Sequence, residues 1–317
     1  MTTSPQTRGT DPQENVTLED LVDSHFHIWD LNKNYYPWLT DKISQNVAKV
    51  TGDYRSIRQD YLIDHFRADI GSLNVVAAVH VQADADPKDS VNETAWLQSV
   101  ADSTGNGMPQ GIVARGDLSA PDAAEIIMAH CQYANMRGMR VEMHPGLNAA
   151  PDYDPLKDET WLRNFALLRE HGLVFEVRAA SPEQTDGLIR LMREHPDTTF
   201  IFPHLGLSIW RDEDSVAAWK RNLQVYRELG NVYVKLSGYG LFGLGWTIEE
   251  VRPYVLECID TMGPDRLVCG SNYPVDSMAA SYHRIWETHS ALLDDAGCDS
   301  AERRLILRDN AMNVYRL

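Results

Sequence analysis

Short runs rich in Val, Ile, Phe and Tyr recur along the chain beyond residue 18, and most of them end in polar or histidine-bearing segments. Such runs, bounded by polar residues, are typical of buried strands in a parallel sheet. They begin at Leu21 (LVDSHFHI), Asn74 (NVVAAVHVQA), Gly111 (GIVARGDL), Arg137 (RGMRVEMHP), Leu173 (LVFEVRA), Thr198 (TTFIFPHLG), Asn231 (NVYVKLSG) and Arg266 (RLVCGSNYP). The pattern therefore predicts eight strands.

Longer stretches between several of these runs carry apolar residues at the spacing of amphipathic helices. We expect helices over residues 60–70, 159–171, 182–195 and 214–229. Gly172 and Gly230 follow the second and the fourth, at the place where glycine commonly ends a helix. Ser181 and Pro182 give the third an N-cap and a proline in its first turn. Strands that alternate with helices in this number predict an α/β fold, a closed (β/α)8 barrel of the TIM type.

The gap between the first two strands is the longest and contains NKNYYPWLTDKISQ, which is too aromatic for a plain linker. We expect a long aromatic loop after the first strand, folded over the mouth of the barrel. No internal repeat or domain boundary is evident, so residues 19–317 are expected to form one barrel domain. Residues 1–18 are polar and contain proline, which is typical of a disordered tail.

Composition changes this picture little, because 43% hydrophobic and 24% charged residues are ordinary for a globular protein. The net charge of −17 argues against nucleic acids and anionic membranes as partners, because an acidic surface repels them. No apolar run approaches the length of about 18 residues that a membrane helix needs, and the N-terminus lacks the apolar core of a secretory signal. The four cysteines form no CxxC pair and indicate a reducing compartment. We expect a cytoplasmic protein that acts on a small molecule, with homo-oligomer formation left open.

Polar side chains end the predicted strands, and in a (β/α)8 barrel the chemistry sits at these carboxyl ends. They include His25 and His27, Gln82, Arg140, Glu176 and Arg178, His204, Lys235, and Asn272. Because alternate residues of a strand point the same way, His25 and His27 can both face the barrel interior. Two such imidazoles can bind a metal ion or donate hydrogen bonds to a developing oxyanion, and polar filling of the barrel is the simpler alternative. His204 can add a third imidazole or be a core histidine bonded to the backbone.

Five motifs follow one another along the chain: VDSHFHIWD with YYPWL, VHVQA followed by ETAWL, FPHLG, NVYVKLSG and GPDRLVCGSNYP. In this order they resemble the amidohydrolase-related family, and most closely its fuconolactonase-like and 2-pyrone-4,6-dicarboxylate lactonase-like members. The resemblance, from near Leu21 to the end, implies a (β/α)8 barrel that hydrolyses a carbonyl or lactone carbon. Many lactonase relatives need no metal, whereas decarboxylase and amidohydrolase relatives bind a divalent ion. His25 and His27 match the first-strand pair, His204 the sixth-strand histidine, and Arg140 a fourth-strand position that often contacts substrate.

Two departures from the family pattern bear on the chemistry. The end of the fifth strand reads FEVRA, so Glu176 or Arg178 stands where metal-binding relatives usually carry histidine. The family motif GSDWP or GSDYP reads GSNYPVD, which puts Asn272 where an aspartate that activates water or binds metal is expected. An amide cannot act as a general base at neutral pH, although it can orient water or substrate. Asp276 can replace the missing carboxylate, or it can be a turn residue after Pro274.

The residues therefore favour a metal-independent lactonase that acts on a small oxygenated acid. Water would be activated by a carboxylate, with Asp276 as the first choice and Glu176 as the second, while the histidines polarise the carbonyl. The candidate catalytic residues are His25, His27, His204, Asn272, Asp276 and Glu176. The candidate substrate-binding residues are Arg140, Arg178, Gln82 and Lys235, with Trp29, Tyr35, Tyr36 and Trp38 as a lid. Ion pairing and plain loop packing are the structural alternatives for these two groups.

Two other functions stay open at this point. A decarboxylase or amidohydrolase that depends on a divalent metal would use His25, His27 and His204 as ligands of zinc or manganese. No cofactor is the favoured expectation, because no obvious anionic ligand completes that set unless Glu176 or Asp276 does so. A barrel that has lost catalysis and serves as a binding protein is suggested by Asn272. For an enzyme, the expected context is the breakdown of carbohydrate or aromatic acids.

Overall fold

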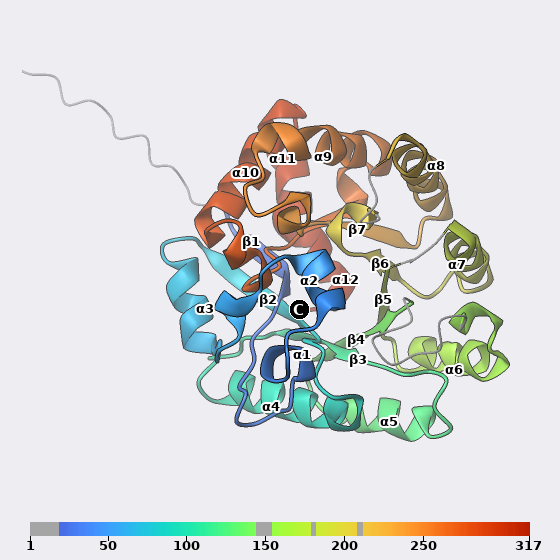
Figure 1. Cartoon of the computed structure of the whole chain (residues 1–317). Helices are drawn as coiled ribbons and strands as arrows, with labels where there is room; N and C mark the ends of the chain where they lie inside the picture. Colours follow the sequence, from blue (N-terminus) through green and yellow to red (C-terminus); the bar gives the residue numbers. More distant parts are fainter. Residues whose placement is uncertain (1–18, 144–153, 179–181, 208–211) are drawn as a thin grey trace, which may run out of the picture.

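The computed structural model describes residues 19–143, 154–178, 182–207 and 212–317, so the predicted tail lies outside the described residues. Eight strands form one sheet in chain order, and each pairs in parallel with the next. The strands are β1 (Leu21–Phe26), β2 (Val75–Val81), β3 (Gly111–Arg115), β4 (Met136–Glu142), β5 (Val174–Arg178), β6 (Phe200–Phe202), β7 (Val232–Leu236) and β8 (Leu267–Cys269). The predicted (β/α)8 barrel is confirmed (Figure 1).

Helices follow the strands and surround the barrel (Figure 1). They are α3 (Ile63–Ile70), α4 (Ser90–Asp102), α5 (Ala123–His130), α6 (Glu159–Glu170), α7 (Pro182–Glu194), α8 (Glu213–Leu229), α9 (Ile248–Met262) and α10 (Tyr282–Asp295). The predicted helices correspond to α3, α6, α7 and α8, with ends shifted by a few residues at most. Gly172 and Gly230 have φ of 62° and 76°, the left-handed conformation in which glycine ends a helix without steric cost. The N-cap predicted at Ser181 lies outside the described residues.

Both faces of the barrel strands are covered by apolar side chains. Val22, Val79 and Val113 pack in an inner cluster that includes Tyr315 of α12 (Asn310–Tyr315). The other strand face packs on the helices, and Phe175 of β5 meets Phe165 of α6 with ring centroids 4.9 Å apart. Burial of both faces explains why these strands read as nearly continuous apolar runs.

The C-terminal segment closes the barrel where the strands begin. A Cβ on Gly111, the first residue of β3, would lie 3.0 Å from Cδ2 of Leu317. Near the start of β4, Nε of Arg137 donates to the carbonyl of Arg316 at 3.2 Å. Figure 1 accordingly places α12 and the C-terminus at the centre of the ring of strands. The C-terminal segment therefore lies opposite the strand ends that carry the predicted site residues.

The barrel closes between its first and last strands at that carboxyl end. The backbone N–H of Asn272 donates to the carbonyl of His25 at 2.7 Å, and that of His27 donates to the carbonyl of Tyr273 at 2.7 Å. Phe26 and Tyr273 form a parallel bridge between these bonds. We call residues 25–27 and 271–273 the seam, because they join the two ends of the sheet.

The long segment after β1 forms a packed unit of its own. It contains α1 (Pro37–Thr40) and α2 (Gln45–Thr51), which lie near the barrel centre in Figure 1. Trp29 and Tyr36 are fully buried in an apolar cluster, and Trp38 packs against it. The indole N–H of Trp29 donates to the carbonyl of Gln59 at 2.7 Å, and that of Trp38 to the carbonyl of Ala83 at 2.8 Å. The aromatic loop is therefore fixed to the end of β2.

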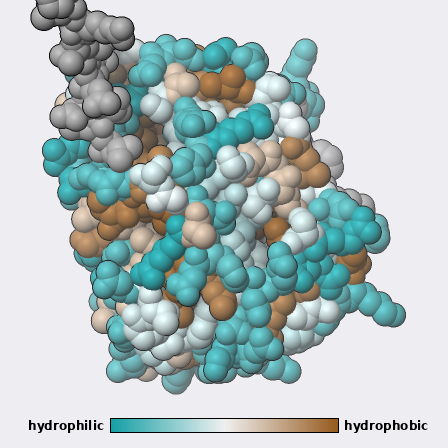
Figure 2. Space-filling view, turned by 90° about the vertical axis from the view of Figure 1, so that its left-hand side faces the viewer, coloured by the Kyte–Doolittle hydropathy of each residue, from teal (hydrophilic) through white to brown (hydrophobic). Residues whose placement is uncertain are grey.

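The described surface exposes few large apolar side chains. They are Tyr35, Ile43, Val76, Met128 and Leu244. Figure 2 shows hydrophilic side chains mixed with smaller apolar areas on one face. Across the four described ranges, no helix combines the length and the apolar character needed to cross a membrane.

Candidate active site

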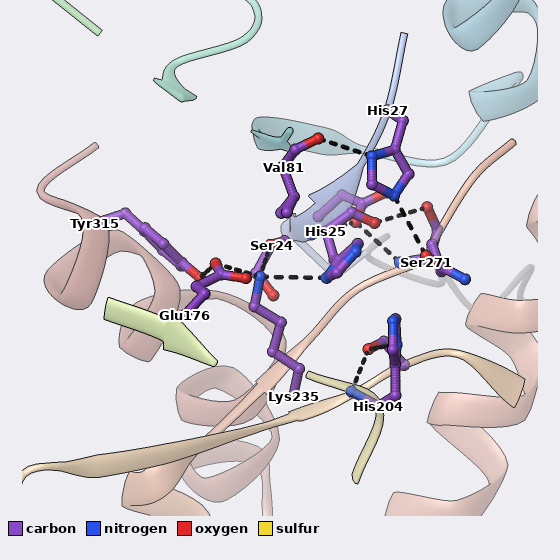
Figure 3. Close-up of polar contacts among 12 residues, drawn as sticks. Ser24, His25, His27, Val81, Glu176, His204, Lys235, Ser271 and Tyr315 are labelled. Atoms are coloured by element: carbon purple, nitrogen blue, oxygen red, sulfur yellow. Dashed lines mark hydrogen bonds and ion pairs between the residues drawn. The ribbon is translucent and has the colours of Figure 1, made fainter. Parts of the chain in front are cut away.

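Three imidazoles meet at the carboxyl ends of β1 and β6. His25 lies in β1, His27 follows that strand directly, and His204 begins the turn after β6. The ring centroids of His25 and His27 are 5.1 Å apart, and those of His25 and His204 are 4.8 Å apart. All three residues are buried, and Figure 3 shows them around one centre. The structure therefore brings the three predicted histidines into one cluster.

A buried ion pair lies next to His25. Nζ of Lys235 on β7 donates to Oε1 of Glu176 on β5 at 2.7 Å and to the carbonyl of Ser24 at 2.6 Å, and it lies 3.4 Å from Nδ1 of His25. The hydroxyl of Tyr315 donates to the same Glu176 oxygen at 2.5 Å (Figure 3). Both charged side chains have no exposed surface. The ion pair therefore connects the histidine cluster to the C-terminal helix that fills the barrel.

Asn272 lies between His27 and Asp276 and donates a hydrogen bond to Asp276. Its Nδ2 donates to Oδ1 of Asp276 at 2.8 Å, and its Oδ1 lies 3.4 Å from Nε2 of His27. The second oxygen of Asp276 accepts from the backbone N–H of Gly240 at 3.0 Å. Nδ1 of His27 lies 2.7 Å from the carbonyl of Val81, which can only accept, so Nδ1 carries the proton and Nε2 of the neutral ring is an acceptor. Asp276 therefore lies next to the histidine cluster, separated from His27 by the side-chain amide of Asn272.

Strained backbone holds His204 and Asn272. Their φ values are 55° and 57°, and Leu205 has 63°. Non-glycine residues in this region cost on the order of 1–3 kcal/mol each and concentrate at functional sites. Oγ of Ser237 lies 3.1 Å from Nδ1 of His204 and accepts from its backbone N–H at 3.2 Å. A Cβ on Gly238, whose φ is 71°, would lie 2.3 Å from the same Nδ1, so only glycine fits there.

Burial shifts the pKa values of the site residues. Desolvation, followed by the charge of Lys235, lowers the pKa of His25 well below its usual value, and desolvation lowers that of His27 to about 4. Both rings are therefore neutral at pH 7. Desolvation raises the pKa of Asp276 to about 6. Desolvation lowers the pKa of Lys235 to about 8, against the opposing effect of Glu176, so the amine is still mainly an ammonium at pH 7.

The other predicted residues lie around this centre in different ways. Arg140 on β4 is partly buried, and its charge contributes to the lowered pKa of both β1 histidines. Gln82 is engaged by Asp84, to whose carboxylate it donates at 3.2 Å and from whose backbone N–H it accepts at 2.7 Å. The side chain of Arg178 lies outside the described part of the chain. Trp29, Tyr36 and Trp38 belong to the loop cluster.

Two residues that secure the site were missed by the sequence analysis. Oδ1 of Asp23 accepts from the backbone N–H of Ser271 at 2.9 Å and of His25 at 3.1 Å, which fastens the seam. Asp23 is two positions before His25, so the alternation along the strand was a usable signal. Tyr315 carried no signal, because its bond to Glu176 joins positions 139 residues apart.

Three imidazoles are a zinc donor set by residue type, but their surroundings do not fit a cation. The ammonium of Lys235 places a positive charge 3.4 Å from the ring of His25. The nearby carboxylates are already engaged, Glu176 by that ammonium and Asp276 by Asn272 and a backbone N–H. In the ranges that the structure describes, no group of three or more His, Cys, Asp or Glu is arranged to hold a metal ion.

The barrel and its histidine cluster define a (β/α)8-barrel protein with a buried polar site at the carboxyl ends of its strands. The chain belongs to the amidohydrolase family, whose model matches residues 22–317. This match confirms the resemblance carried by the five sequence motifs.

Known relatives match almost the whole chain. "Uncharacterized protein y4mH" of Sinorhizobium fredii is 36% identical over 301 residues, which cover 94% of this chain and 98% of the relative. L-fucono-1,5-lactonase of Burkholderia multivorans is 25% identical over 310 residues, covering 93% and 96%. A crystal structure of an amidohydrolase from Burkholderia multivorans with bound zinc superposes with a TM-score of 0.75 at 22% identity, covering 94% of this chain and 99% of the other. The last likeness supports the fold alone.

Proposed function

We propose that the protein is a lactonase that opens the ring ester of a small oxygenated acid without a metal ion. The observation that carries the proposal is the cluster of three histidines beside the buried carboxylate of Asp276, which accepts a hydrogen bond from Asn272. Oδ1 of Asn272 in turn lies 3.4 Å from Nε2 of His27. The similarity to an L-fucono-1,5-lactonase over nearly the full length favours a lactone as the substrate class.

Asp276 is the general base in this proposal. A carboxyl group whose pKa is near 6 is mostly ionised at pH 7 and is still basic enough to accept a proton. It takes a proton from water while the water oxygen bonds to the lactone carbonyl carbon. It returns that proton to the ring oxygen as the ring C–O bond breaks, which yields the hydroxy acid. Glu176 stays the second candidate, because its carboxylate is the counter-ion of the buried ammonium of Lys235, although one of its oxygens has no partner among the described residues.

The histidines orient the water and polarise the carbonyl. Nε2 of His25 is buried and has no hydrogen-bond partner among the described residues, which makes it a candidate contact for a ligand atom. Nε2 of His27 is an acceptor and can receive a hydrogen bond from the attacking water. His204 faces His25 and contributes to the same centre. Arg140 at the edge suits a carboxylate or hydroxyl of the substrate through its planar fork, and Arg178 stays a candidate for the same role.

Turnover of lactones tests this proposal directly. The purified protein is offered a panel of sugar-acid lactones and an aromatic pyrone lactone, with and without a chelator, and its metal content is measured by elemental analysis. We expect ring opening that the chelator does not affect and much less than one metal ion per chain. Activity that the chelator abolishes and zinc or manganese restores would replace the proposal with a metal-dependent hydrolase or decarboxylase. No turnover of any lactone would favour the non-catalytic barrel.

The pH dependence should follow Asp276. Its carboxylate is the active form and its pKa is about 6, so kcat/KM should fall as the pH drops through 6 and level off above it. Below that pKa the rate should fall about tenfold per pH unit. A pH–rate profile between pH 5 and 8, with circular dichroism to show that the protein stays folded, measures this limb. A profile that is flat down to pH 5 would contradict the assignment.

A further inference from the structure

We propose that Lys235 is a positioning residue that holds the neutral ring of His25 in the Nε2–H tautomer, with this proton available to the substrate carbonyl. The catalytic consequence rests on the proposed lactonase function, whereas the tautomer itself does not.

The ammonium of Lys235 has as many protons as it has neighbouring acceptors. An ammonium group carries three protons and no lone pair. Two of them go to the carbonyl of Ser24 at 2.6 Å and to Oε1 of Glu176 at 2.7 Å. The remaining neighbour is Nδ1 of His25 at 3.4 Å. The third N–H therefore points toward this nitrogen.

This contact decides where the ring proton of His25 resides. A proton on Nδ1 would face the ammonium, so Nδ1 is the nitrogen with the lone pair. The ring is neutral, because burial and the charge of Lys235 both disfavour the imidazolium form. The single ring proton then lies on Nε2, the buried atom for which the described part of the chain supplies no partner. A donor in this position is prepared for the oxygen of a lactone carbonyl, whose negative charge grows as water attacks.

The rest of the network keeps the ammonium in place. Lys235 alone in the barrel core would lose its solvation, so a buried partner is needed. Glu176 supplies the opposite charge, and the hydroxyl of Tyr315 holds the same carboxylate oxygen from α12. Buried ion pairs are weak evidence for stability, since desolvation offsets much of their attraction. Orientation of a catalytic ring gives this pair a function that stability alone does not explain.

The tautomer can be measured in the resting protein by NMR of ¹⁵N-labelled histidine. The signals of His25 are identified by their loss in His25→Gln. We expect a pyrrole-type Nε2, a pyridine-type Nδ1 and no titration between pH 5 and 8. In Lys235→Met/Glu176→Gln, which removes both charges and avoids an unpaired buried carboxylate, His25 should show mixed tautomers or partial protonation. Glu176→Gln alone keeps the Lys235 amine, which can donate to Nδ1 of His25 in its charged or its neutral form, and should retain the wild-type tautomer.

Measurement of kcat for lactone hydrolysis provides a second test of the proposal. Relative to Glu176→Gln, the double variant should lose between about 10- and 100-fold in kcat, because complete loss of one oxyanion donor typically costs about 10²- to 10³-fold. A proton on Nδ1 in the wild type, an unchanged tautomer in the folded double variant, or a shifted tautomer with unchanged kcat would each overturn the proposal. A wild type with the Nε2–H tautomer and no lactone turnover would overturn the proposed function while the tautomer assignment stands.

Discussion

Asp276→Asn is expected to lower kcat for lactone hydrolysis by about 10²- to 10⁴-fold, the contribution typical of a general base. The amide has nearly the same shape but cannot accept a proton, and its single oxygen can keep one of the two hydrogen bonds that Asn272 and Gly240 donate to Asp276. KM should change little, because substrate is bound by other groups. Steady-state kinetics at pH 7.5, well above the pKa of Asp276 near 6, measure the loss.

Glu176→Gln is the matched comparison for this variant. It removes the other candidate carboxylate but keeps Lys235 in the barrel, so its loss of kcat should be much smaller. The acidic limb of the pH–rate profile should persist in Glu176→Gln and disappear in Asp276→Asn. The reverse pattern, with full activity in Asp276→Asn and loss in Glu176→Gln, would move the base to Glu176.

Gly238→Ala should lower kcat/KM by about 10²-fold or more without any change to a residue that contacts substrate. The new Cβ would lie 2.3 Å from Nδ1, 2.6 Å from Cγ and 2.9 Å from Cβ of His204, so the imidazole must move. The φ of 71° adds backbone strain for alanine. Displacement of a catalytic group by about 1 Å can cost about 10²-fold. Kinetics of the folded variant measure this loss.

Gly245→Ala controls for the general effect of an added methyl group. Gly245 lies in the same connection between β7 and α9, and a Cβ there would meet no heavy atom within 4 Å. Its kinetics should stay close to those of the wild type. Equal activity in Gly238→Ala and Gly245→Ala would show that the position of His204 does not limit the reaction.

The barrel could be predicted from the sequence, because the signals for its strands and helices lie within short stretches of the chain. Each strand is buried on both faces, so each appears as a short apolar run, and Gly172 and Gly230 mark helix ends by their conformational freedom. The histidine cluster could be predicted for the same reason. His25 and His27 alternate on one strand, and the carboxyl ends of all strands meet at one end of a barrel.

The environment of Lys235 could not be predicted, because it depends on side-chain directions across the barrel. The sequence left a substrate contact and an ion pair open without naming a partner, and the structure engages the ammonium with Glu176 and the carbonyl of Ser24. That arrangement also involves Tyr315, whose distance along the chain leaves no local pattern. The hydrogen bond from the backbone N–H of Gly240 to Asp276 could not be predicted either, because it depends on how two loops pack together.

The seam links the appearance of activity to the last step of folding. His27 and Asn272 are 245 residues apart along the chain, yet they meet where the first strand joins the segment after the last. Contacts of such long sequence separation form late, because the entropy of closing a large loop is lost before they stabilise the chain. Helices and most strand pairs can therefore be in place while the site is still incomplete. The catalytic rate of a refolding sample accordingly reports on the joining of the two chain ends, which a measurement of helix content does not detect.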